Sequence, residues 1–253
     1  GNCKTYKGIA MLSNIRILWL ITARSGSKSI PNKNIKPLNN EPLINFRIKS
    51  ALSISSAEDI WVSTDSEKYA LIAKKSGATV PFLRPNSLAA DSSSSNDVVL
   101  HSMRYANKMG RNYDYIGLLE PTSPFIYFTD LLNAIEKLRN NVEATGIVAV
   151  KETRPNTFFI QDNTEYLNYL ALRLKEIKKT GRQNFNTQIT PSGGFYISKW
   201  QTFLESKTFY TENTMPYLVP DECSLEIDEP IDWLWAEFLI KEKIIDVNKI
   251  FNL

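Results

Sequence analysis

A loop rich in cations and small polar residues follows the first apolar run of the sequence. Residues 23–34 read A-R-S-G-S-K-S-I-P-N-K-N and include Arg24, Lys28 and Lys33. Cations neutralise phosphate charge, and backbone amides near Gly26 can donate to phosphate oxygens. The loop matches neither G-x-x-x-x-G-K-[ST] nor G-x-G-x-x-G. It therefore predicts polyphosphate binding of another kind, and the alternative is a solvated basic turn.

The elements that must position this loop alternate between strand and helix patterns. Strands are predicted at Ile17–Thr22, Asp59–Ser63, Ala78–Leu83, Tyr115–Leu119, Gly146–Val150 and Gly194–Ser198. Helices are predicted at Pro42–Ile54, Ser66–Ser76, Asp97–Lys108, Thr129–Arg139 and Glu229–Lys241. This order predicts an α/β fold, a three-layer α/β/α sandwich with a mostly parallel sheet. Ligands of such sheets bind at the carboxyl ends of the strands, which is where the loop begins.

Composition narrows the function classes. The chain has 253 residues, of which 43% are hydrophobic and 23% charged, as in ordinary globular proteins. A net charge of +3 is too small to indicate bulk nucleic-acid binding. No apolar run is long enough to span a membrane. Cys3 and Cys223 lack metal-ligand spacing, and no secretory signal is visible, so we expect a cytoplasmic protein.

The strand and helix rhythm breaks between residues 151 and 191. This stretch mixes polar residues with Phe158, Phe159, Tyr166, Leu167, Tyr169 and Leu170. Apolar surface outside the main alternation needs a partner, so we interpret the stretch as a dimerisation arm that makes a homodimer. Folding back onto its own core is the alternative. We expect a single domain over residues 11–253, with residues 1–10 as an added or disordered leader.

Short segments along nearly the whole chain resemble the motifs of the acylneuraminate cytidylyltransferases, the CMP-N-acetylneuraminic acid synthetase family. The first loop is similar to the family's R-x-G-S-K-x-I-P-x-K-N. The other similar segments, in chain order, are Ser63-Thr64-Asp65, Arg84 to Asp91, Leu118 to Pro124, Arg182-Gln183, Gly193 to Ile197 and Glu226-Ile227-Asp228. No single segment is specific, but together they are.

The resemblance implies a reaction and a set of site residues. Such enzymes join CTP to the anomeric hydroxyl of a nine-carbon 2-keto sugar acid and release pyrophosphate, on a fold similar to other nucleotide-sugar transferases. The implied catalytic residues are Arg24, Lys28, Lys33 and Asp228. The implied nucleotide-binding residues are Arg24, Ser27, Lys28, Lys33, Asn34, Arg84 and Ser95. The implied sugar-binding residues are Glu120, Thr122, Ser123, Arg182, Gln183 and Tyr196.

The resemblance also implies a Mg²⁺ cofactor held by Glu226 and Asp228. Residues i and i+2 of a strand point to the same side, and Mg²⁺ accepts one or two carboxylates plus phosphate oxygens. The alternative for Asp228 is helix capping, since it lies two residues before Pro230.

The chain departs from the family pattern mainly on the sugar side. Glu120 replaces a glutamine, Ile126 an arginine, Thr157 a lysine, Ser192 an asparagine and Glu226 an aspartate, while Ser29 replaces a glycine in the first loop. A carboxylate at Glu120 would repel an anionic sugar unless it is paired with a cation or binds an amine or hydroxyl. We therefore expect CMP transfer to a sugar other than ordinary N-acetylneuraminate.

Three alternatives stay open at this point. The same reaction could use Kdn, legionaminic acid or an eight-carbon Kdo-type acid. The chain could be a catalytically degenerate CTP-binding protein. The third alternative is a nucleotide-sugar glycosyltransferase with a similar sheet. Its D-x-D metal motif would more typically lie in mid-chain, whereas the similar segment Glu226-Ile227-Asp228 lies near the end of this sequence.

Overall fold

A computed structural model describes residues 14–153, 166, 171–172, 175–176 and 188–253. The predicted leader and most of the predicted arm lie outside the described residues. None of the helices within the described ranges is both long and apolar enough to cross a membrane.

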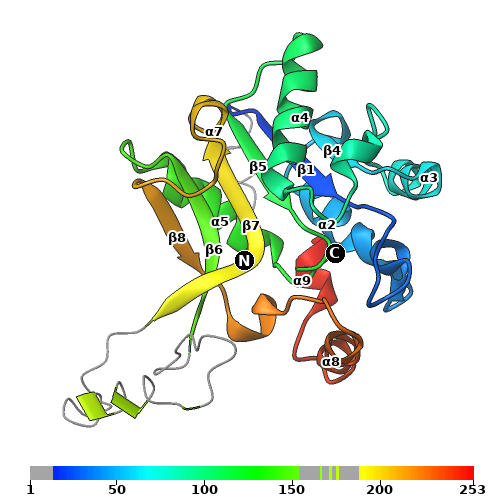
Figure 1. The fold of residues 1–253 in the computed structure, drawn as a ribbon, viewed down its shortest axis with the longest axis vertical. Coiled ribbons are helices and arrows are strands. Elements are labelled where there is room, and N and C mark those ends of the chain that lie inside the picture. The colour runs from blue at the N-terminus through cyan, green and yellow to red at the C-terminus, as the bar shows by residue number, and fades with distance from the viewer. Residues whose placement is uncertain (1–13, 154–165, 167–170, 173–174, 177–187) are drawn as a thin grey trace.

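The described residues build a six-stranded sheet in the order β4-β1-β5-β7-β6-β8 (Figure 1). The strands are β1 (Ile17–Thr22), β4 (Ile60–Ser63), β5 (Tyr115–Leu119), β6 (Gly146–Glu152), β7 (Ile189–Lys199) and β8 (Thr214–Leu218). β7 runs antiparallel to both of its neighbours, and all other pairings in this sheet are parallel. The prediction of a mostly parallel sheet is confirmed.

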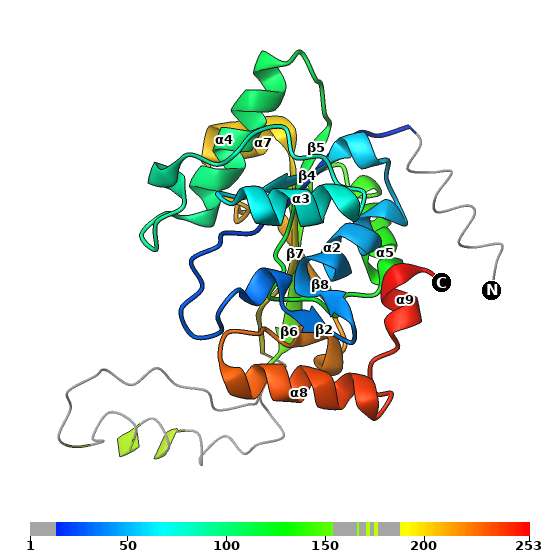
Figure 2. The same cartoon turned by 90° about the vertical axis from the view of Figure 1, so that its right-hand side faces the viewer.

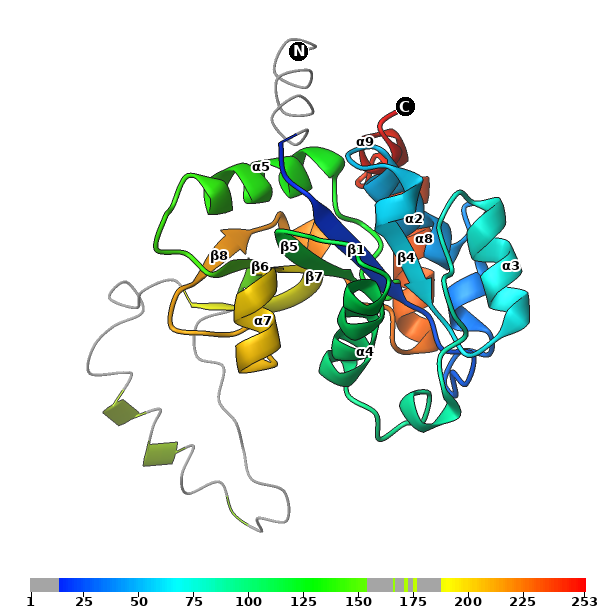
Figure 3. The ribbon, with the colours of Figure 1, turned by 90° about the horizontal axis from the view of Figure 1, so that it is seen from above.

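Alternate residues of β1 face two separate hydrophobic cores. Ile17, Trp19 and Ile21 pack into one core, whereas Leu18 and Leu20 pack into the other. The first core is covered by α2 (Leu43–Leu52), α3 (Glu67–Lys75), α5 (Phe128–Arg139), α8 (Pro230–Lys241) and α9 (Val247–Phe251). The second is covered by α4 (Ser95–Lys108) and α7 (Trp200–Ser206). Helices therefore cover both sheet faces, as predicted (Figure 3).

Minor elements complete the fold. They are the strand pair β2 (Pro37–Leu38) and β3 (Glu41–Pro42) and the short helices η1 (Lys33–Ile35), η2 (Ala57–Asp59), η3 (Asn86–Leu88) and η5 (Asp221–Ser224). The predicted strand at Ala78–Leu83 is wrong: only Thr79 bridges, to Trp61. Pro81 lacks the N–H that a continuing ladder would need.

The last long helix exposes much of its apolar face. The apolar spacing of this segment predicts a packing role for Trp235, but Ile231, Leu234, Trp235 and Phe238 are 43–69% exposed, so that prediction is wrong. Trp233 and Leu239 supply the buried contacts of α8 instead. Figure 2 shows α8 at the outer edge of the described body.

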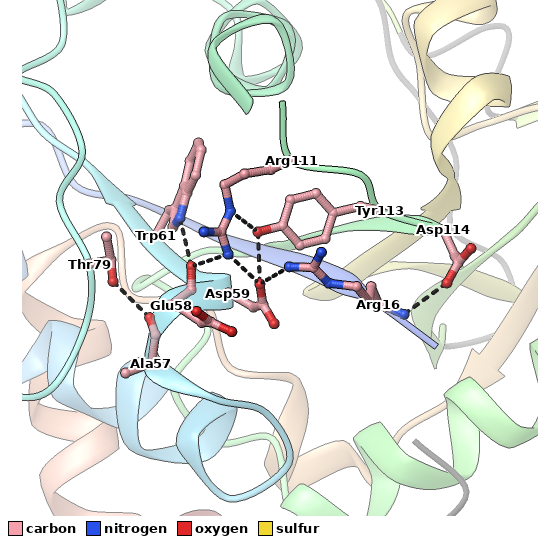
Figure 4. Close-up of polar contacts among 9 residues, drawn as sticks. All are labelled: Arg16, Ala57, Glu58, Asp59, Trp61, Thr79, Arg111, Tyr113 and Asp114. Atoms are coloured by element: carbon pink, nitrogen blue, oxygen red, sulfur yellow. Dashed lines mark hydrogen bonds and ion pairs between the residues drawn. The ribbon is translucent and has the colours of Figure 1, made fainter. Parts of the chain in front are cut away.

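A cluster of polar side chains links the amino ends of β1, β4 and β5 through hydrogen bonds and ion pairs (Figure 4). Asp59 Oδ1 accepts hydrogen bonds from Arg16 Nη2 at 3.2 Å, Arg111 Nη2 at 2.9 Å and the Tyr113 hydroxyl at 2.8 Å. Because these three strands are parallel, their carboxyl ends lie together at the other end of the sheet, where loops can bind a ligand.

Candidate active site

A cavity of about 180 Å³ opens at the carboxyl ends of β1 and β5. It is lined by residues of the first loop, the segment that precedes α4 and the turn after β5. They are Thr22, Arg24, Ser27, Lys33, Asn34, Arg84, Leu88, Ala90, Ser93, Ser94, Ser95, Val98, Glu120, Pro121 and Thr122. The structure thus brings together every predicted nucleotide-binding residue except Lys28, whose side chain is 81% exposed.

Two internal anchors fix the path of the first loop. The Ser25 backbone N–H and hydroxyl both donate to the Asp65 carboxylate, at 2.8 and 2.7 Å. Asn34 Nδ2 donates to the Arg24 carbonyl at 3.1 Å, while its buried Oδ1 has no partner. An unpaired buried acceptor on a cavity wall is suited to a ligand N–H. The role of Asp65, the last residue of Ser63-Thr64-Asp65, was not predicted from the sequence.

Arg84 is held rigidly beside the loop. Its Nε donates to the Ser63 hydroxyl at 3.0 Å and its Nη2 to the Ser63 carbonyl at 2.6 Å. Burial lowers the pKa of Arg84 to about 10, which leaves the guanidinium cationic at neutral pH. A fixed positive charge therefore contributes to the cavity wall.

Asp91 engages two of the loop cations. Its carboxylate lies 2.5 Å from Arg24 Nη1 and 2.6 Å from Lys28 Nζ. Asp91 is the last residue of the segment Arg84 to Asp91 that resembles a family motif, but no role was predicted for it from the sequence. In this structure one carboxylate occupies the positions at which Arg24 and Lys28 could meet phosphate oxygens.

Lys33 links the first loop to the segment that precedes α8. Its Nζ donates to the Ile227 carbonyl at 2.9 Å and lies 3.8 Å from Asp228 Oδ1. Burial lowers the pKa of Lys33, and the nearby Asp228 carboxylate partly offsets this shift. The loop and the predicted metal segment, separated by almost two hundred residues, therefore meet at one site.

The Asp228 carboxylate is open to a ligand. The start of α8 is closed by a capping box of Glu229 and Asp232, in which Asp232 Oδ2 accepts from the backbone N–H groups of Asp228 and Glu229 at 3.0 and 2.8 Å. The Asp228 side chain is 64% exposed and touches only Lys33 as an ion pair among the described residues. Capping by Asp228, the alternative considered from the sequence, is not what the structure shows.

Glu226 and Asp228 could together hold a divalent cation. Burial, and secondly the charge of Asp228, raises the pKa of Glu226, as expected for two nearby carboxylates. Within the part of the chain that the structure describes, no three His, Cys, Asp or Glu residues cluster as a metal site. A pair is sufficient for Mg²⁺, which commonly binds one or two carboxylates and completes its shell with phosphate oxygens and water.

A second cavity of about 200 Å³ adjoins the first and shares Ser95 and Glu120 with it. Its remaining lining is Asn96, Leu118, Tyr196, Thr208, Phe209 and Tyr210. Tyr196 arrives there because β7 pairs with β5 in the register that places it opposite Leu118. Phe209 and Tyr210 were missed from the sequence, since they lie in a loop after α7 that carries no recognisable motif.

Glu120 stands between the two cavities. Ser95 Oγ donates to its Oε1 at 3.4 Å, a long hydrogen bond. Burial, with a smaller effect from the charge of Glu226, raises the pKa of Glu120. Arg47 lies beneath the turn, fully buried, but its guanidinium donates to the backbone carbonyls of Ser123 and Gly194.

Ser123 and Glu226 meet at Gly193 on β7. Gly193 has φ +77°, and a β-carbon there would collide with the Glu226 carboxylate and lie 2.9 Å from Ser123 Oγ. The Ser123 hydroxyl is buried without a hydrogen-bond partner. Thr122, which lines the first cavity, accepts the Ile227 N–H at its carbonyl, at 2.8 Å, and so ties the turn to the metal segment.

Two predicted sugar-binding residues, Arg182 and Gln183, lie outside the described residues. His101 borders neither cavity; its ring packs edge-on against Phe82 at 4.6 Å. His101 is the one histidine of the sequence, and its place within the predicted helix Asp97–Lys108 indicates a structural or surface role, which agrees with this packing.

Comparison with known proteins places this geometry in context. The family model described as Cytidylyltransferase matches residues 18–214. The chain is 34% identical to the CMP-N,N'-diacetyllegionaminic acid synthase of Legionella pneumophila over 93% of this chain and 98% of that protein. It is 31% identical to an N-acylneuraminate cytidylyltransferase of Escherichia coli, over 90% of this chain and 53% of that protein.

A solved structure shares the fold. A CMP:2-keto-3-deoxy-manno-octonic acid synthetase complexed with CTP superposes with a TM-score of 0.62 at 14% identity, covering 90% of this chain and 99% of that one.

Proposed function

Because this chain belongs to the cytidylyltransferase family of nucleotidyltransferases, we propose that it transfers CMP from CTP to a nonulosonic acid, a nine-carbon 2-keto sugar acid. The observation that carries the proposal is the meeting of Lys33 with Asp228, 3.8 Å apart, at the edge of a cavity lined by the cationic loop. Phosphate-binding cations and a metal-binding carboxylate are thereby brought to one place.

The proposed reaction is a substitution at the α-phosphorus of CTP. The anomeric hydroxyl oxygen of the sugar forms a bond to this phosphorus, and the bond from the phosphorus to the bridging oxygen breaks. Pyrophosphate leaves with the electron pair, and the hydroxyl proton passes to water. Charge builds on the phosphate oxygens during this step, so fixed cations are the main source of stabilisation.

Three cations of the first loop carry that role. Arg24 and Lys33 line the cavity, and Lys28, which does not line it, lies 2.6 Å from the same Asp91 carboxylate that pairs with Arg24. Ser27 contributes to the same wall, and its hydroxyl donates to the Ile30 carbonyl at 2.7 Å, which keeps the loop closed. Asn34, Arg84 and Ser95 form the part of the wall assigned to the cytidine half.

Mg²⁺ is the proposed cofactor, and Glu226 and Asp228 would hold it. When bound, it would neutralise phosphate charge and favour loss of the sugar hydroxyl proton. The exposed Asp228 carboxylate and the raised pKa of Glu226 support the assignment, because a cation would relieve the repulsion between the two.

Glu120, Thr122, Ser123 and Tyr196 form the proposed sugar side, with Arg182 and Gln183 joining them by resemblance. The legionaminic acid synthase relative supports an acid of this size. We also propose that the protein is a cytoplasmic homodimer, on the basis of the apolar arm predicted from the sequence. Light scattering coupled to size exclusion tests the dimer: a mass near 57.6 kDa, twice 28.8 kDa, is expected, and a monomer mass would contradict it.

The experiment that tests the function is pyrophosphate release from CTP and Mg²⁺ across neuraminic, legionaminic and Kdo-type acids. Release with one acid, lost in Asp228→Ala, is the expected result. Asp221→Ala, which removes an acidic residue from η5 instead, is the matched control and should retain release. CTP binding without release on any acid would instead indicate a catalytically degenerate nucleotide-binding protein.

A further inference from the structure

The second cavity combines one carboxylate with aromatic walls. Glu120 faces Tyr196, Phe209 and Tyr210 across a volume of about 200 Å³, and none of its described lining residues is a lysine or arginine. We propose that this cavity receives a cationic nitrogen substituent of the sugar acid, an amidine or an ammonium group, and that Glu120 selects for it. The inference rests on the proposed function and specifies the substrate of the same site.

Glu120 is half-buried and lacks a cationic partner in direct contact with its carboxylate among the described residues. The hydrogen bond that it accepts from Ser95 is 3.4 Å long. The charge of buried Arg47 lowers the pKa of Glu120 and partly offsets its burial, but the hydrogen bonds of the Arg47 guanidinium go to the backbone carbonyls of Glu120, Ser123 and Gly194 and not to the Glu120 carboxylate. A carboxylate held in this way gains strongly from a ligand that brings its own positive charge.

The aromatic residues suit the same ligand. The Tyr196 ring centroid lies 5.5 Å from that of Phe209 and 6.3 Å from that of Tyr210, so the three rings form one aromatic cluster in the cavity lining. Rings within about 6 Å of a cation attract it through their negative faces. Burial and the charge of Glu226 raise the pKa of Glu120, while the charge of Arg47 lowers it, and a bound cation would further favour the ionised carboxylate.

A neutral N-acyl group should bind in this cavity less tightly than a cationic group. Its carbonyl oxygen is an acceptor and would be repelled by the Glu120 carboxylate. An amidinium of the same shape replaces that oxygen with an N–H donor and offers two parallel hydrogen bonds to the carboxylate.

The test uses two keto-sugar acids that differ only in one nitrogen substituent, acetyl in one and acetimidoyl in the other. We expect kcat/KM for pyrophosphate release to favour the acetimidoyl acid at least about tenfold, the ratio expected of one added charged hydrogen bond. Glu120→Gln keeps the shape and removes the charge, so it should abolish or reverse the preference. Glu143→Gln, which removes one exposed charge outside both cavities, should preserve it.

The outcomes separate the inference from the reaction. Equal or better use of the acetyl acid by the unmodified protein, or an unchanged ratio in Glu120→Gln, would overturn the cation assignment while leaving the proposed reaction intact. Release with neither acid would overturn the reaction on these substrates. In that case, calorimetry would measure the affinity of each acid for the CTP-loaded protein. Tighter binding of the acetimidoyl acid would support the assignment of the second cavity to a cationic substituent, and equal or absent binding would overturn it.

Discussion

The Asp91 carboxylate lies 2.5 Å from Arg24 Nη1, one of the three cations that we propose to bind the triphosphate. Lys28 shares the same carboxylate at 2.6 Å. A triphosphate that binds this loop must therefore replace Asp91 as the partner of both cations. The three side chains are at least 39% exposed, which makes the replacement inexpensive.

Asp91→Asn should bind CTP more tightly. Removing the competing carboxylate frees Arg24 and Lys28, and we expect the Kd for CTP to fall about threefold at low salt, because exposed ion pairs contribute little. The gain should shrink as salt rises. Titration calorimetry measures it, with Glu136→Gln on α5 as a control for charge alone. Weaker binding by Asp91→Asn would show that Asp91 organises the loop rather than competes with the nucleotide.

The first loop was the part of the site most open to prediction. Its cations, serines and glycine are contiguous, and Ile17–Thr22 forms β1 over the expected residues because a continuous apolar run fits a strand buried on both faces. The helices α2, α3, α4, α5 and α8 were predicted to within a few residues because of their apolar spacing, whereas the short helices α7 and α9 were not predicted.

The contacts between distant segments could not be predicted in this way. Nothing local to Asp91 indicates that it meets Arg24, and nothing local to Tyr210 indicates that it shares a wall with Tyr196. The contact of Tyr210 with Tyr196 depends on β7 entering the sheet antiparallel between β5 and β6, which is a property of the whole fold. The exposed face of α8 was missed because apolar periodicity alone does not say which face meets the core.

Glu120→Gln should make the protein more stable at neutral pH. Burial raises the folded-state pKa of Glu120 above 4.5, so its ionisation costs more in the folded than in the unfolded chain. The unmodified protein therefore loses stability as pH rises through the folded pKa, and the glutamine variant does not. Thermal melting from acid to neutral pH should show a Tm gain for the variant that grows with pH. A gain that is constant or grows toward acid would contradict the raised pKa.

Gly193→Ala should destabilise the protein and disturb the sugar side. The new β-carbon would lie 2.9 Å from the buried Ser123 Oγ, would displace the flexible Glu226 carboxylate and would also hold a positive φ of +77°. Gly110→Ala is the matched control, since Gly110 has φ +71° but open space around it. Strained backbone alone costs about 1–3 kcal/mol. Urea unfolding should show a larger loss for Gly193→Ala than for Gly110→Ala, and equal losses would exclude the collision.

Arg47→Met should lower the free energy of unfolding by about 3 kcal/mol, because it leaves buried carbonyls of Ser123 and Gly194 without donors. Arg47→Lys should recover only part of this loss, since one ammonium cannot reproduce the planar fork that spans both carbonyls. Urea unfolding of both variants checks this. Full stability of Arg47→Met would show that the guanidinium does not hold the turn after β5 to β7.

The most direct test of the central claim is identification of the product. The protein is incubated with CTP, Mg²⁺ and a nonulosonic acid, and mass spectrometry and phosphorus NMR follow the nucleotide. The account predicts a CMP-sugar with a single phosphodiester phosphorus, formed in equal amount with pyrophosphate and absent when Asp228 is replaced by alanine. CTP that stays intact, or that yields free CMP without a sugar adduct in the presence of every acid tested, would contradict it.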